Sequence, residues 1–231
     1  MTRRGSGDAR ARQERHWRRA RYRSADDPVA LAYAQPKLDL VERVLPLADR
    51  TVLDVGCGVG LFTRLLRRRA RLVVATDLSP FMLRQTDRRG YVCADACRLP
   101  FADRAFDVAL AANLLHHTDR PQAVVDELAR VARTAVVLIE PNRLNPIMAA
   151  FALLVPAERR GLRSSRRFLR SLVQRAGLRC RAAWCSGWIS QNNTPGFLVP
   201  WLRRFDGDSA LGEYHVLVAA RGPAGADGGA A

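Results

Sequence analysis

An apolar segment that contains an acid and runs into three alternate glycines constrains the fold of this chain more than any other feature. The segment is 52–55, with Asp54 inside it, and the glycines are Gly56, Gly58 and Gly60. Glycine is needed where the backbone takes a positive φ or lies against a ligand, because a Cβ would clash there. A helix that begins after such a turn offers unpaired N–H groups. The pattern predicts a buried strand, a turn and a helix that bind a nucleotide-like cofactor on an open α/β sheet.

The spacing of these glycines separates two kinds of cofactor. The dinucleotide fingerprint G-x-G-x-x-G requires a glycine at position 61, where this chain has Leu61. Asp54, two residues before the first glycine, is a poor neighbour for a pyrophosphate and a good one for a cationic ligand. These two observations disfavour a dinucleotide-dependent oxidoreductase.

Four later segments repeat the pattern of an apolar run that ends in a polar or acidic residue. They are 72–77 with Asp77, 91–96 with Asp95, 106–113 with Asn113, and 134–140 with Glu140. Asp77 follows Asp54 by 23 residues, a position from which a carboxylate can accept hydrogen bonds from both ribose hydroxyls. Two further strands are expected over 178–186 and 214–220, and amphipathic helices over 28–45 and 166–178.

Together these motifs resemble those of the class I S-adenosylmethionine-dependent methyltransferases, most of all their type 11 group. The resemblance spans residues from about 30 to 220 and includes Glu127 and Arg130 on a helix over 121–131. It implies a Rossmann-like, doubly wound α/β fold. The expected sheet is seven-stranded and mostly parallel, with strand seven antiparallel and helices on both faces. The Lys-Pro-Gly-Gly turn of the family is absent, and Arg133-Thr134 joins helix to strand directly, which we interpret as a loop variation.

The resemblance also implies the cofactor, S-adenosyl-L-methionine (SAM), with S-adenosyl-L-homocysteine as its product. In the family the end of the third strand meets the adenine, and an acid there accepts a hydrogen bond from the exocyclic amine. The residues expected to bind the cofactor are Asp54, Gly56, Cys57, Gly58, Gly60, Asp77, Leu78, Asp95, Ala96, Asn113 and Leu114.

Two neighbouring histidines are the candidates for acid–base catalysis. Methyl transfer mainly requires that donor and acceptor be aligned, and a base is needed only when the acceptor must lose a proton. His116 and His117 follow the fourth strand, and histidine titrates near neutral pH. His117 is preferred because it aligns with the histidine that related sequences have most often in the motif after the fourth strand. The alternative is that neither histidine does acid–base work.

The net charge of +16 is concentrated in two segments. Residues 1–25 hold nine arginines against two acids, and 158–181 hold nine arginines against Glu158. We expect 1–27 to be a basic, disordered arm, although it could also bind a polyanion. The tail 222–231, rich in glycine and alanine, is expected to be disordered. Binding to nucleic acid is compatible with this charge but is not favoured.

Five cysteines without a paired framework favour free thiols in a reducing compartment, and hence a cytoplasmic location. Cys93 and Cys97 lack a second pair at zinc-site spacing, so no metal is expected. The longest apolar run, 146–156, is shorter than the ~20 residues of a membrane span. It could be a buried cap helix, which we favour, an interfacial helix that reaches lipid, or a dimer contact. Peripheral membrane contact is therefore not the favoured expectation.

The domain is expected over 28–221, with cap elements at 28–45, 143–163 and 187–212 that shape the substrate pocket. The predicted activity is transfer of a methyl group to an O, N or C atom of a small or medium-sized, partly apolar organic molecule. The alternatives are an RNA methyltransferase that uses the arginine-rich segments and a non-catalytic scaffold. The oligomeric state is left open between monomer and homodimer.

Overall fold

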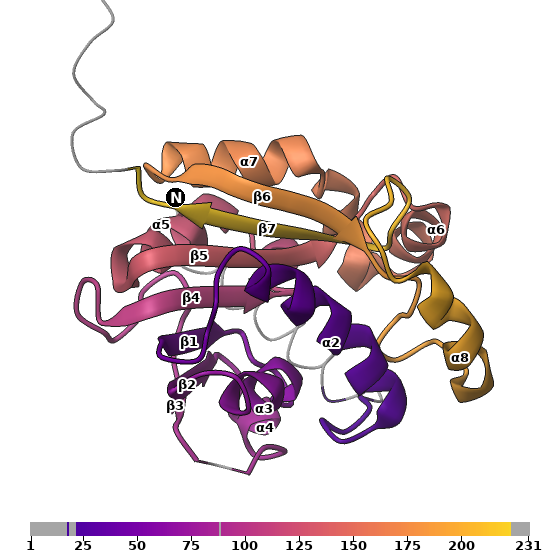
Figure 1. Ribbon diagram of the computed structural model, residues 1–231, viewed down its shortest axis with the longest axis horizontal. Helices are drawn as coiled ribbons and strands as arrows, with labels where there is room; N and C mark the ends of the chain where they lie inside the picture. The colour runs from indigo at the N-terminus through magenta and orange to yellow at the C-terminus, as the bar shows by residue number, and fades with distance from the viewer. Residues whose placement is uncertain (1–17, 19–21, 88, 223–231) are drawn as a thin grey trace, which may run out of the picture.

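Seven strands form one sheet in the computed structural model, which describes residues 18, 22–87 and 89–222 (Figure 1). The strand order is β3-β2-β1-β4-β5-β7-β6, and β7 lies antiparallel between β5 and β6. The predicted seven-stranded, mostly parallel sheet is confirmed. The strands are β1 Thr51–Val55, β2 Leu72–Asp77, β3 Tyr91–Cys93, β4 Phe106–Ala112, β5 Ala132–Pro141, β6 Arg179–Ser186 and β7 Tyr214–Ala220.

Helices cover both faces of this sheet, as the resemblance implies. One core lies between the sheet and α2 with α3, and a second lies between the sheet and α5 with α7. The central strands are buried on both faces, which is why their sequences are continuously apolar. The α-helices are α2 Pro28–Glu42, α3 Leu61–Arg67, α4 Pro80–Leu83, α5 Pro121–Val131, α6 Pro146–Leu154, α7 Arg166–Arg175 and α8 Val199–Leu202. Short 3₁₀ turns are η1 Leu115–His117, η2 Pro156–Arg163, η3 Gly196–Leu198 and η4 Arg203–Phe205.

The junction between α5 and β5 shows how the missing family turn is bypassed. Helix α5 ends at Val131, and Ala132 is at once the C-cap of the helix, with extended backbone angles, and the first residue of β5. The guanidinium of Arg133, the second residue of β5, donates to a carboxylate oxygen of Asp107 and to the carbonyl of Arg104. The direct join leaves the carboxyl ends of the strands unaffected.

Helix α2, expected as a cap element, is a core helix instead. Its side chains Tyr33 and Lys37 are almost fully buried, and the Nζ atom of Lys37 donates to the Tyr33 carbonyl at 2.6 Å. The ammonium group also lies over the rings of Tyr33 and Tyr214, at 3.9 and 4.7 Å from their centroids. Burial lowers the pKa of Lys37 to about 7, against the opposing charges of Glu213 and Asp206.

The packed domain begins earlier than the expected boundary at residue 28. The backbone N–H of Arg23 donates to Asn192 Oδ1 at 3.1 Å, and its guanidinium donates to the Thr194 carbonyl and to Asp27. Asp27 in turn caps α2 by accepting the N–H groups of two residues in its first turn. Residues 22–27 therefore belong to the domain, while most of the expected arm (1–17 and 19–21) and 223–231 lie outside the described residues.

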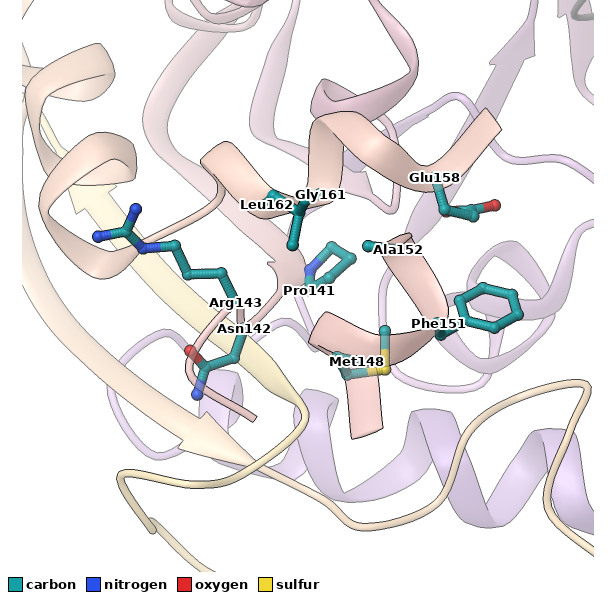
Figure 2. Close-up of a pocket in the computed structure, with 9 residues that line it drawn as sticks. All are labelled: Pro141, Asn142, Arg143, Met148, Phe151, Ala152, Glu158, Gly161 and Leu162. Carbon is teal, nitrogen blue, oxygen red and sulfur yellow. The ribbon is translucent and has the colours of Figure 1, made fainter. Parts of the chain in front are cut away.

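The favoured interpretation of 146–156 as a buried helix is wrong. In α6 only Ala152 is buried, and Ile147, Leu153 and Leu154 are 58, 61 and 80% exposed. Figure 2 shows that one side of α6, with Met148 and Ala152, faces η2 and Pro141, the last residue of β5. The other sides of the helix are also apolar, and they are the exposed ones. No helix in the described part of the chain is long and apolar enough to cross a bilayer.

Candidate active site

A cavity of about 510 Å³ opens beyond the carboxyl ends of β1, β2 and β4. Its volume lies within the range of small-molecule sites. Every residue that the sequence assigns to the cofactor lines this cavity, with the exception of Gly60. Strand ends bring these residues together because parallel strands place their carboxyl termini on one edge of the sheet.

Gly58 and Gly60 serve the turn in different ways. Gly58, at φ +55°, lines the cavity, and a Cβ on it would meet no protein atom within 4 Å. Gly60, at φ +84°, is the N-cap of α3, and a Cβ there would lie 2.6 Å from the Tyr91 hydroxyl oxygen. Gly60 therefore has a conformational role, because it lets the chain turn into α3 beneath Tyr91. Its contact with the cofactor stays a prediction.

Replacing Gly58 by alanine is expected to weaken SAM binding at least about tenfold, since the new methyl group projects into the cavity. The left-handed backbone adds a cost of about 1–2 kcal/mol in stability. Gly177→Ala is the matched control: this glycine has φ +73°, also has open space around it, and lies away from the cavity. Calorimetric titration should show weaker SAM binding for Gly58→Ala and unchanged SAM binding for Gly177→Ala. Equal losses of SAM affinity in both variants would contradict the prediction.

Asp54 and Asp77 stand at the ends of neighbouring strands and differ in their partners. Asp54 is 1% exposed and accepts a hydrogen bond from Thr63 Oγ1 at 2.6 Å. Burial raises the pKa of Asp54 to about 7, and the charge of Asp77 adds to the rise. Asp77 accepts the N–H of Gly58 at 2.9 Å and that of Ser79 at 2.8 Å, so it ties the glycine turn to β2.

The backbone amides of the turn are partly committed to protein. The N–H groups of Gly56 and Cys57 both donate to the Thr76 carbonyl, at 2.8 and 2.9 Å. Cys57 lines the cavity as the sequence predicts, but its N–H is directed to β2. Gly56 is also packed tightly against Leu114, because a Cβ on this glycine would lie 2.8 Å from Leu114 Cδ1. The turn is thus held from both sides before any ligand binds.

Asn113, directly after β4, has a left-handed backbone at φ +54° and borders the cavity. Its Nδ2 donates to the hydroxyl of Tyr33 at 2.7 Å. Its Oδ1 is buried and has no hydrogen-bond partner among the described residues. Buried acceptors without a partner are rare in proteins, and strained backbone gathers at ligand sites. The oxygen itself is closed off from solvent, so the missing partner and the left-handed backbone mark a constrained position at the border of the cavity.

Glu140, at the end of β5, organises the η1 turn that carries both histidines. Its Oε1 accepts the N–H groups of Leu114 and Leu115, at 2.8 and 2.7 Å. Its Oε2 lies 2.7 Å from Nδ1 of His116. Glu140 is 1% exposed and does not line the cavity, so it acts on the site through the turn.

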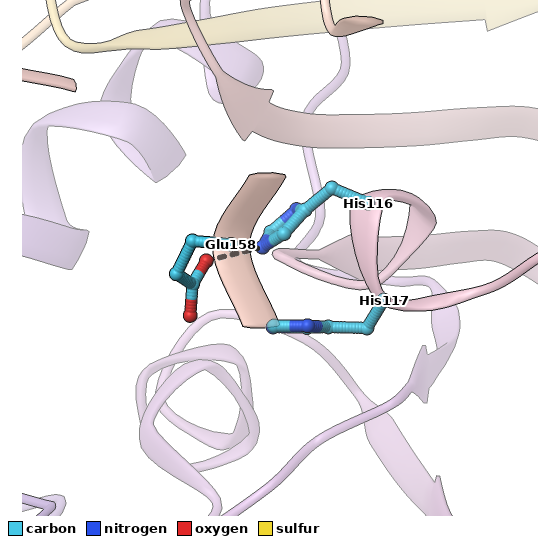
Figure 3. A group of neighbouring side chains, drawn as sticks. All are labelled: His116, His117 and Glu158. Atoms are coloured by element: carbon cyan, nitrogen blue, oxygen red, sulfur yellow. Dashed lines mark ion pairs between the residues drawn. The ribbon is translucent and has the colours of Figure 1, made fainter. Parts of the chain in front are cut away.

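The structure places the two candidate bases in different surroundings. His116 is buried outside the cavity lining, with Nδ1 against Glu140 and Nε2 3.3 Å from Glu158 of η2 (Figure 3). Burial alone would lower the pKa of His116, but the two carboxylates outweigh it and raise that pKa to about 9. His117 lines the cavity, with its ring centroid 4.0 Å from that of His116.

His116, His117 and Glu158 also place potential ligand atoms within 4.8 Å of one another, a set of residue types found in metal sites. Both ring nitrogens of His116 face carboxylates, and a protonated imidazole satisfies both with its two N–H groups. We therefore interpret His116 as the cation of this cluster, which joins η2 to the end of β5. A protonated His116 could not accept a proton, so His117 is the stronger candidate base, and both roles stay predictions.

Residues from three distant segments join the site, and of these segments only the one with Tyr22 was not expected to shape the pocket. Tyr22 of the expected arm and Gln191 of the 187–212 segment line the cavity. Glu158 reaches His116 across 42 positions of the chain. Burial, followed by the charges of Glu158 and Asp77, raises the pKa of Tyr22, so its hydroxyl stays protonated. None of these contacts follows from local spacing. Residues of α2 and α6, expected to cap the pocket, do not line it.

The family model described as "Methyltransferase domain" matches residues 53–139. This part of the chain is a class I SAM-dependent methyltransferase domain. The matched range runs from β1 to β5 and holds every residue that the sequence assigns to the cofactor. The recognition of the family and of SAM as its cofactor is confirmed.

Relatives with assigned names share this domain. A ubiquinone biosynthesis O-methyltransferase of Xylella fastidiosa (strain 9a5c) is 32% identical over 130 residues, which are 52% of this chain and 52% of that protein. A malonyl-[acyl-carrier protein] O-methyltransferase of Halorhodospira halophila is 36% identical over 138 residues, 54% of this chain and 47% of its own. The chain spans about half the length of the curated relatives it matches.

Solved structures of other methyltransferases have the same fold as this chain. A SAM-dependent methyltransferase of Thermotoga maritima, described as a possible histamine N-methyltransferase, superposes with a TM-score of 0.64 at 18% identity, over 84% of this chain and 92% of that one. A SAM-dependent methyltransferase from Aquifex aeolicus gives a TM-score of 0.60 at 19% identity, over 84 and 93%.

Proposed function

We propose that the chain is a SAM-dependent methyltransferase that methylates an O, N or C atom of a small or medium-sized, partly apolar organic molecule. The observation that carries this proposal is one cavity that is lined by buried Asp54, by Asp77 and Asp95, and by His117. The names of the relatives above make oxygen the first acceptor atom to test.

The residues present fit the cofactor. SAM supplies a methyl group already activated by a sulfonium. Asp54 would face the cationic part of the ligand, and Asp77 and Asp95 would accept hydrogen bonds from hydroxyl or amine groups. Apolar side chains also line the cavity and would meet the flat or aliphatic parts of both substrates. They are Leu61, Phe62, Met82 and Val124.

His117 is the residue that we propose as the base, when the acceptor must lose a proton. It borders the cavity, and its turn is held by the hydrogen bonds of Glu140 to Leu114 and Leu115. His117→Gln is expected to lower kcat about 100-fold or more while leaving the Kd for SAM within about threefold, since base catalysis contributes 10²–10⁴-fold. Steady-state kinetics and calorimetry would test this. An unchanged kcat would make His117 a packing residue.

The test of the function itself is calorimetric titration with SAM and S-adenosylhomocysteine at two salt concentrations, with NAD as control. We expect micromolar, salt-insensitive binding of both SAM compounds and none of NAD. Release of S-adenosylhomocysteine in the presence of a panel of hydroxylated, partly apolar acceptors then identifies turnover. Absence of SAM binding would favour the scaffold alternative.

The RNA alternative draws on the arginine-rich 158–181 segment, and the structure directs part of it away from the site. Helix α7 packs against α5 and β6, and none of its residues lines the cavity. RNA held through many phosphate contacts would bind with a steep salt dependence.

The five cysteines, all free thiols, are compatible with a reducing compartment such as the cytoplasm.

A further inference from the structure

Large exposed apolar side chains gather in two cap segments, although such residues are normally scattered singly over a surface. One group lies on and around α6, and the other runs from η3 through α8 and η4 to the loop before β7. Leu154 and Phe197 are the most exposed, at 80 and 81%. The apolar cap surface, as we name it, consists of Leu144, Ile147, Leu153, Leu154, Phe197, Trp201, Phe205 and Leu211.

Both segments are anchored on the same side of the molecule. Met148 of α6 packs against the same core cluster as Val199 and Leu202 of α8. The loop before β7 is tied to the start of α6, because Asn145 Nδ2 donates to the Leu211 carbonyl at 2.7 Å. Figure 1 shows α6 and α8 projecting from one end of the sheet, on the right of the view. The two segments that carry the apolar residues therefore lie at one end of the sheet.

Exposed arginines flank both apolar segments along the chain. Arg143 and Arg159 flank α6 and are exposed, as are Arg203 and Arg204 of η4. Glu158, which follows α6, is instead engaged with buried His116. Long arginine side chains can lay their stems along apolar groups and keep the guanidinium in water. These arginines outnumber the surface acids of the same segments, Asp206 and Asp208, so the apolar surface is flanked by a net positive charge.

This combination selects among the partners that could cover it. A symmetric contact between two copies would bring the same arginines against one another. A nucleic acid would meet the arginines but leave leucine and phenylalanine side chains facing phosphates. An anionic bilayer offers acyl chains for the apolar side chains and phosphate groups for the arginines, and it accepts a tryptophan such as Trp201 at the level of its headgroups.

We propose that the apolar cap surface docks the protein on anionic membranes, with α6 and the α8–η4 segment in the interface. This revises the sequence-based expectation, which left the interfacial interpretation of 146–156 unfavoured and saw 187–212 only as a pocket cap. The proposal goes beyond the proposed function and does not depend on methyl transfer. Docking would bring the domain to acceptors dissolved in a bilayer.

Vesicle co-sedimentation of the full chain, without SAM, tests the proposal. We expect at least about tenfold stronger binding to phosphatidylglycerol-containing vesicles than to phosphatidylcholine alone. The double variant Leu154→Ser/Phe197→Ser should lose about tenfold or more of this binding, and Arg203→Gln/Arg204→Gln should lose most of the preference for anionic lipid. Val44→Ser/Leu72→Ser is the matched control, because these exposed apolar residues lie outside the cap surface and should have no effect.

Two outcomes would overturn the proposal. If Leu154→Ser/Phe197→Ser binds anionic vesicles as well as the unchanged protein, the attraction resides elsewhere, for example in the arginines of 1–25. If the unchanged protein ignores vesicles and is a dimer that these substitutions dissociate, the surface is a contact between copies. Calorimetry with SAM on the same samples keeps either result separate from failure of the proposed function.

Discussion

Replacing Glu140 by alanine is expected to lower the free energy of unfolding by about 3–5 kcal/mol, the range found when one member of a buried ion pair is removed. Two effects combine. The N–H groups of Leu114 and Leu115 lose their acceptor, and His116 is left with Glu158 as its remaining carboxylate partner. Chemical denaturation followed by circular dichroism measures the loss.

Glu140→Gln separates the two contributions. A glutamine can still accept the two backbone N–H groups through its Oε1, but it removes the negative charge. We expect a smaller loss of stability and, in both variants, a fall of the His116 pKa from about 9, since burial then meets less opposition. Titration of the imidazole by NMR reads this directly. A loss below about 1 kcal/mol in the alanine variant would contradict the role assigned to Glu140.

Asp54→Asn is expected to weaken SAM binding by about 10- to 100-fold, since a hydrogen bond to a charged group contributes about 1.5–3 kcal/mol. A cationic ligand favours the ionised carboxylate, and the Asp54 pKa is about 7 in the free protein. Affinity should therefore rise between pH 5.5 and 7.5, by up to about tenfold per unit. The asparagine variant should show little of this rise. Unchanged affinity in the variant would refute the placement of the site.

The same substitution should not destabilise the fold, which distinguishes a lost contact from misfolding. The folded-state pKa of Asp54 lies above the value of about 3.9 expected in the unfolded chain. The folded state therefore binds the proton more tightly, and this group's contribution to stability is lost as pH rises from about 4 to 7. Asp54→Asn has no proton to lose. At neutral pH it should unfold at an equal or higher denaturant concentration.

The sheet and the cofactor side of the site follow from the sequence because their signals are local. Each strand is an apolar run that ends in a polar residue, and parallel strands bring those ends to one edge. Asp54, Asp77 and Asn113 could therefore be placed in one cavity before any coordinate was known. Gly60 shows the limit of this reasoning, because motif membership alone does not reveal that this glycine turns the chain beneath Tyr91.

The remaining features depend on contacts between segments far apart in the chain. The sequence around His116 does not predict that Glu158 lies beside it. The basic segment with Tyr22 likewise does not predict that this residue lines the cavity. The apolar run of α6 suggested burial, yet hydrophobic composition does not say whether protein, lipid or water covers a helix. The answer depended on how few of the described residues reach its outer sides.

The buried Lys37 has a consequence for how the protein's charge can be controlled. It is the sole lysine of the chain, so the permanently cationic side chains at the surface are arginines. Arginine keeps its proton at any pH a folded protein meets, and it is not a substrate for lysine acetylation. Neither acidity nor acetylation can therefore remove the positive charges of the arginines around the apolar cap surface. Dissolved salt weakens their attraction for anions by screening.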